Sequence, residues 1–181
     1  MTTRRSALIG AGSAITLAAC GSTPQRAAGT VVAAGQPAAL LIWAVARDQL
    51  AGWPRKPSTR ALAALPALAA NLPELGALGG VGQPANLEAI AALGPRLVID
   101  YGDTDPENHA LGDRMKTRLN VDWHLINGSL TQIPAAIREA GELLDASRSA
   151  AGLADEAAAV LDRWRRAPAG SSFYYARGVD G

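Results

Sequence analysis

The chain has 181 residues, which is enough for one ordinary domain and too few for two full-sized ones. Hydrophobic residues make up 49% and charged residues 18%, so the sequence can form a core and is not expected to be disordered. The formal net charge of +1 argues against nucleic acid as a partner, because phosphate binding needs a concentrated basic surface. The single cysteine excludes a disulfide framework and a cysteine-rich metal site.

The N-terminus has the pattern of a secretory signal peptide, which we place at residues 1–19. Two arginines precede a short apolar run that ends in small residues, and this run is shorter than the ~18 residues of a membrane-spanning helix. Leu17–Cys20 looks like a bacterial lipobox, in which Cys20 is lipidated. The alternative is an ordinary signal peptide followed by a lone buried cysteine. We expect residues 20–29 to be a lipidated tether, and the export route, general or twin-arginine, stays open.

From residue 30 the sequence alternates short aliphatic runs with helical stretches. Continuous apolar strands separated by helices predict a parallel sheet that is buried on both faces. The fold class is therefore α/β, and residues 30–130 are expected to form an N-terminal lobe with helices flanking the sheet. The predicted strands are 30–34, 49–53, 75–78, 97–101 and 122–126, and the predicted helices are 38–46, 59–70, 86–93 and 107–119.

The last third of the chain is mainly helical. Apolar residues from Ile133 to Leu144 recur at i, i+4, i+7 and i+11, which predicts a helix that opens near Ser129 or Thr131. A second apolar stripe predicts a helix over 149–166, so residues 131–167 form a helical segment. A strand is predicted at 172–177, close to the end of the chain, and we expect residues 171–181 to begin a second, truncated lobe.

Residues 86–99 read NLEAIAALGPRLVI and resemble the NLExIxxLxPDLVI signature of class III substrate-binding proteins. These proteins are the extracytoplasmic receptors of ABC importers for ferric siderophores, haem and cobalamin. Arg96 stands where the family usually has aspartate, which we interpret as a surface change. The resemblance spans residues 30–181 and implies two α/β lobes joined by a long backbone helix, with ligand bound between them. The present chain would hold the first lobe, the backbone helix and the opening strand of the second.

Glu88 lies in the first turn of a helix that Asn86 is predicted to cap. The helix dipole stabilises a carboxylate at this position by about 0.3–1 kcal/mol, which alone would explain the residue. The resemblance implies a further role, because the family uses the matching glutamate to pair with arginines of the membrane permease. The two roles are compatible.

Ligands of parallel α/β sheets meet the loops at the carboxyl ends of the strands. Trp53 could stack on a flat ligand or pack on Pro54 as a rim aromatic. Arg55 and its basic neighbours would suit an anionic ferric chelate, or form a solvated loop. The predicted ligand-binding residues are Gln36, Trp53, Arg55, Gly80, Tyr101, Asp103, Asn127 and Arg177.

Acidic residues and one histidine between Asp103 and His109 suggest a metal site, but aspartate and proline before a helix are ordinary capping chemistry. No second histidine stands at ligand spacing, and the glycine-rich stretch 76–82 lacks the dinucleotide-binding spacing. We therefore predict neither a metal nor a cofactor.

The predicted function is that of an extracytoplasmic lipoprotein that captures a ferric siderophore or related chelate and delivers it to an ABC permease. Its expected partners are that chelate (a haem or cobalamin-like ligand included), the permease, and the membrane through a lipid anchor. We expect no enzymatic activity, since no serine, cysteine or histidine stands in a nucleophile setting. Two alternatives stay open: a hydrolase or oxidoreductase of the α/β type, and a receptor for bare zinc or manganese.

Overall fold

The computed structural model describes residues 31–79, 82–166 and 170, and its centre is a three-stranded parallel sheet. The strands are β1 (Val31–Ala33), β2 (Leu97–Gly102) and β3 (Asp122–Asn127), in the order β1-β2-β3. The predicted signal peptide, the tether with Cys20, and the strand at 172–177 lie outside the described residues. The α/β fold predicted from the sequence is confirmed.

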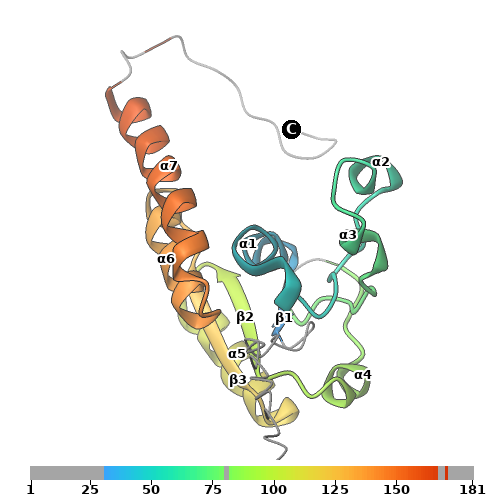
Figure 1. Cartoon of the computed structure of the whole chain (residues 1–181). Helices are drawn as coiled ribbons and strands as arrows, with labels where there is room; N and C mark the ends of the chain where they lie inside the picture. Colours follow the sequence, from blue (N-terminus) through green and yellow to red (C-terminus); the bar gives the residue numbers. More distant parts are fainter. Residues whose placement is uncertain (1–30, 80–81, 167–169, 171–181) are drawn as a thin grey trace, which may run out of the picture.

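Helices cover both faces of the sheet (Figure 1). On one face α1 (Gln36–Ala46), α6 (Ile133–Leu143) and α7 (Ser147–Arg166) pack on a core that includes Leu97 and Ile99 of β2. On the other face α4 (Leu87–Ala92) and α5 (Pro106–Leu119) pack on Val98. The alternation along β2 follows from the two-residue period of a strand. Along β1 and the first half of β2 both faces are buried, as the apolar runs predicted, whereas in the edge strand β3 only Ile126 is buried.

The helix ends follow the capping chemistry of the sequence. The Asn86 side chain accepts hydrogen bonds from the backbone N–H groups of Glu88 and Ala89, at 3.0 and 3.1 Å. The Asp105 carboxylate accepts one from the backbone of Asn108 at 2.8 Å. These bonds satisfy backbone donors that a first helical turn leaves unpaired, and the predicted cap at Asn86 is confirmed.

Two predicted strands are wrong. Residues 49–53 and 75–78 form isolated parallel bridges instead of ladders: Val31 with Leu50, Trp53 with Glu74, and Ala77 with Pro84. The 3-10 helix η1 (Arg47–Gln49) occupies the start of the first segment. A three-residue β1 leaves little edge to pair with, and prolines in the bridging segments lack the N–H that a ladder needs.

The predicted helix at 59–70 is two short helices, α2 (Thr59–Leu62) and α3 (Leu68–Asn71). Pro66 lies between them, and a proline inside a helix removes one hydrogen bond and clashes with the preceding turn. The helix predicted from Ser129 or Thr131 begins as the 3-10 helix η2 (Leu130–Gln132) and continues as α6. The last helix, α7, starts two residues before the predicted 149.

Helices α6 and α7 form an antiparallel pair, which stands at the left of Figure 1. Gly141 of α6 meets Ala150 near the start of α7, and Arg138 pairs with Asp155 at 2.6 Å one turn further along. The end of α7 therefore returns to the level of Thr131 and Pro134, at the junction of η2 and α6. In the part of the chain that the structure describes, no helix is both long enough and apolar enough to cross a bilayer.

Candidate functional site at the carboxyl edge of the sheet

The three strands are parallel, so the loops that follow them lie at one edge, which we call the carboxyl edge. These loops begin after Ala33 of β1, Gly102 of β2 and Asn127 of β3. Gly102 pairs with Asn127 in the sheet register, and the Gly128 N–H donates to the Gly102 carbonyl at 2.8 Å. A Cβ at Gly128 would lie 2.9 Å from the Cα of Gly102, so the close approach of these two loops requires glycine.

A basic loop lies beside the start of α1 at this edge. The Gln36 side-chain oxygen accepts a hydrogen bond from the Arg55 backbone N–H at 3.2 Å. The Lys56 backbone donates to the Glu74 carboxylate at 3.1 Å. The side chains of Arg55, Lys56 and Arg60 are exposed, and none of them forms an ion pair with another described residue. The loop therefore presents the positive charges of Arg55 and Lys56 at the carboxyl edge, and Arg60 follows in α2.

Three further predicted ligand-binding residues lie at or just after the carboxyl ends of β2 and β3. Tyr101 is half-buried against the core on the α1 face, and burial raises the pKa of its hydroxyl. Asp103 is exposed, and its carbonyl accepts from the Asn108 side chain at 2.9 Å. The Asn127 side chain accepts from the backbone of Ser129 at 2.9 Å. The structure thus places five predicted residues at one edge, namely Gln36, Arg55, Tyr101, Asp103 and Asn127.

The remaining predicted ligand residues are not at that edge or cannot be placed. Trp53 is fully buried, its indole N–H donates to the Ala69 carbonyl at 2.9 Å, and its ring lies 5.2 Å from that of Trp43. The expectation of an accessible stacking residue or rim aromatic at this position is wrong, because the side chain lies in the core. A buried indole N–H needs a hydrogen-bond acceptor, and α3 supplies one. Gly80 and Arg177 lie outside the described residues.

Asp100 is a residue of this edge that the sequence reasoning missed. It lies in β2 next to Tyr101 and accepts a hydrogen bond from the Tyr101 backbone N–H at 2.9 Å. Burial raises the pKa of its carboxyl group, and the backbone hydrogen bond opposes the shift. The sequence could have indicated Asp100, because a carboxylate inside an otherwise apolar strand is unusual and charged side chains are seldom buried without a partner.

The acidic stretch before α5 serves as a helix cap. Asp105 caps α5, and its carboxylate also accepts from the Asn108 side chain at 3.3 Å. Across residues 31–79, 82–166 and 170, no group of three or more histidine, cysteine, aspartate or glutamate side chains is placed to hold a metal ion.

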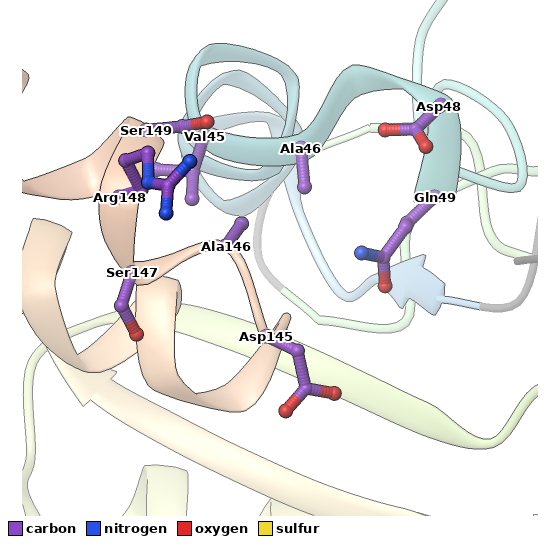
Figure 2. Close-up of a pocket in the computed structure, with 9 residues that line it drawn as sticks. All are labelled: Val45, Ala46, Asp48, Gln49, Asp145, Ala146, Ser147, Arg148 and Ser149. Carbon is purple, nitrogen blue, oxygen red and sulfur yellow. The ribbon is translucent and has the colours of Figure 1, made fainter. Parts of the chain in front are cut away.

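A separate pocket of about 700 Å³ lies at the opposite, amino edge of the sheet, where α1 and α6 end (Figure 2). None of the residues predicted to bind ligand is among those that line this pocket. Its lining residues are Val45, Ala46, Asp48, Gln49, Asp145, Ala146, Ser147, Arg148 and Ser149.

No protein-family model matches the chain, and no curated protein matches it. Solved structures do match. An ABC transporter solute-binding protein from Sulfurospirillum deleyianum has a TM-score of 0.66 and 24% identity, over 76% of this chain and 43% of that one. An ABC transporter substrate-binding protein from Listeria monocytogenes has a TM-score of 0.57 and 19% identity, over 74% and 46%.

The haem complex of IsdE from Staphylococcus aureus also matches, with a TM-score of 0.56 and 18% identity, over 74% of this chain and 46% of that one. The predicted resemblance to ABC substrate-binding proteins is therefore confirmed at the level of the fold. The chain spans less than half the length of each of these three proteins.

Proposed function

We propose that this chain is the ligand-binding first lobe and the interlobe helix of an extracytoplasmic substrate-binding protein of an ABC importer. The observation that carries the proposal is the fold similarity, which covers about three quarters of this chain but less than half of each solute-binding protein. A single lobe followed by a long helix would make up about that share of a two-lobed binding protein. The ligand would bind at the carboxyl edge, where parallel α/β sheets meet their ligands.

The course of α7 supports a second lobe on the same side. Its apolar stripe begins buried at Ala150 and Ala154, but Val160 is 52% exposed and Trp164 61% exposed. These exposed side chains lie near the end of the helix that returns to the carboxyl edge. A lobe that follows α7 would cover them and close over the ligand, which gives the usual enclosure of a small-molecule site.

The charges at the carboxyl edge favour an anionic metal chelate, such as a ferric siderophore or haem, over a cobalamin-like ligand, whose side chains are uncharged amides. Arg55 and Lys56 supply positive charge that forms no ion pair with another described residue, and guanidinium groups bind carboxylates in a bidentate manner. The Tyr101 hydroxyl adds a hydrogen-bonding group at the same edge. One structure of similar fold is IsdE complexed with haem.

Delivery and anchoring complete the proposed function. Glu88 is exposed in the first turn of the capped helix α4, where its carboxylate can meet arginines of a permease. Export by residues 1–19 and lipidation at Cys20 would hold the lobe at the outer side of a membrane.

Charge reversal at Glu88 tests the proposal in cells that depend on the protein for uptake. Glu88→Arg should abolish uptake of the chelate and leave its binding unchanged, because the reversed charge repels the permease arginines. Asp113→Arg is the matched control, since Asp113 is also an exposed acidic residue of a helix on the same face of the sheet and lies in the middle of α5, and it should leave uptake intact. Loss of chelate binding in Glu88→Arg would assign Glu88 to the ligand site or the fold, and normal uptake would contradict the docking role.

A further inference from the structure

Residues 143–146 connect α6 to α7, and we call them the α6–α7 corner. Backbone N–H groups within the corner satisfy three carbonyls at the end of α6: Leu144 donates to Ala140, Ala146 to Gly141, and Asp145 to Glu142. Asp145 has a φ of 47°, which is the left-handed conformation that commonly ends a helix. The next two carbonyls, those of Leu143 and Leu144, receive hydrogen bonds from side chains far away in the sequence.

Those two side chains are Arg96 and Gln49. The Arg96 guanidinium donates to the Leu143 carbonyl from both terminal nitrogens, at 3.2 and 3.3 Å. The Gln49 amide donates to the Leu144 carbonyl at 2.7 Å, and its oxygen accepts from Arg96 Nη2 at 2.8 Å. Arg96 thus does more than replace a surface aspartate, because it ties the segment before β2 to the end of α6.

Burial of Gln49 and the charge of Arg96 both make the hydrogen bonds to the end of α6 costly to lose. Gln49 is only 3% exposed, so loss of its partner would leave a buried amide unsatisfied. A guanidinium at a helix C-terminus interacts favourably with the negative end of the helix dipole. The end of α1 and the corner also share one buried apolar cluster, which includes Val45, Ala46 and Leu144, and the pocket in Figure 2 lies beside this contact.

We propose that Gln49 and Arg96 are positioning residues: they clamp the α6–α7 corner and so fix the direction in which α7 leaves the lobe. The inference rests on the proposed function, in which α7 carries the second lobe. A fixed direction of α7 then sets how the second lobe meets the carboxyl edge. Gly141 contributes to the same geometry, because a Cβ there would lie 2.4 Å from that of Ala150 and force the helices apart.

The direction of α7 can be measured without any ligand, by electron–electron distance spectroscopy on the full chain. Spin labels would be placed on the exposed residues Arg114 of α5 and Arg163 of α7 by cysteine substitution in a Cys20→Ser background. The parent chain should give one narrow distance distribution. Arg96→Ala should broaden and shift it, and so should Gln49→Leu.

Arg148→Ala is the matched control, since it removes another exposed arginine just after the corner, in the first turn of α7. It should leave the distribution unchanged. Arg96→Ala replaces a surface side chain, and circular dichroism should show unchanged helix content in that variant. An unchanged distribution in Arg96→Ala, or an equal broadening in Arg148→Ala, would overturn the clamp. Either result would leave the uptake test of Glu88 unaffected, so the two proposals fail separately.

Discussion

Burial in the fold opposes the ionisation of Asp100. Burial raises its pKa in the folded chain, so the folded state keeps the proton to a higher pH than the unfolded state does. The free energy of unfolding then falls as the pH rises from below the ordinary aspartate pKa of about 3.9 through the raised value. Asparagine carries no charge and can accept the same hydrogen bond from the Tyr101 backbone.

We therefore expect Asp100→Asn to be more stable than the parent at about pH 7 and equally stable at about pH 3, where Asp100 is protonated in both states. Urea unfolding at the two pH values measures this. A stability difference that does not change with pH would show that the charge of Asp100 is not the cause.

Trp53 shows that the residue type alone does not decide between a ligand-binding position and a core position. An aromatic residue near a strand end fits both a ligand platform and a core position, and only the fold supplied the Ala69 carbonyl that accepts its indole N–H. Trp53→Phe should cost about 1–3 kcal/mol of unfolding free energy, because it leaves that acceptor without its donor. Trp43→Phe is the control and should cost less, since Trp43 is only partly buried. Equal costs in urea unfolding would contradict the role of this hydrogen bond.

At the scale of elements, prediction succeeded where the local sequence decides the structure. The apolar run from Leu97 predicted β2, and Asn86 predicted the start of α4. The bridges at Leu50 and Ala77 could not be predicted in the same way, because a ladder depends on the length of a partner strand elsewhere in the chain. The same holds for Arg96, whose acceptor at Leu143 is 47 residues away.

The end of α5 provides a test at this scale. Asn120 caps the helix with a φ of 48°, a left-handed conformation in which a Cβ is unfavourable and asparagine and glycine are tolerated. Asn120→Ala should lower the free energy of unfolding by about 1 kcal/mol, whereas Asn120→Gly should change it little. Thermal unfolding of the two variants would contradict this account if alanine were as stable as glycine.

At the scale of the whole molecule, the sequence alone led to the α/β lobe and to five residues of the carboxyl edge, because strand ends and loop composition are local features. The anchoring prediction also belongs here. Cys20→Ser should release the protein from the membrane fraction into the soluble fraction, because a serine cannot carry the thioether-linked lipid. Cell fractionation with immunoblotting measures this, and membrane association that persists in the variant would contradict lipidation at Cys20.

The central claim is that the carboxyl edge forms one half of a ligand site, and a nuclear magnetic resonance titration tests it most directly. The chain without its predicted signal peptide would be titrated with gallium protoporphyrin, a gallium-loaded siderophore and cobalamin. Because one lobe supplies only about half of the enclosing contacts, at least one of these ligands should bind weakly, no tighter than about millimolar. The shifts should be confined to the carboxyl edge, around Gln36, Arg55, Tyr101, Asp103 and Asn127. Shifts at the amino-edge pocket of Figure 2, no shifts with any ligand, or micromolar binding by the monomeric chain would contradict it.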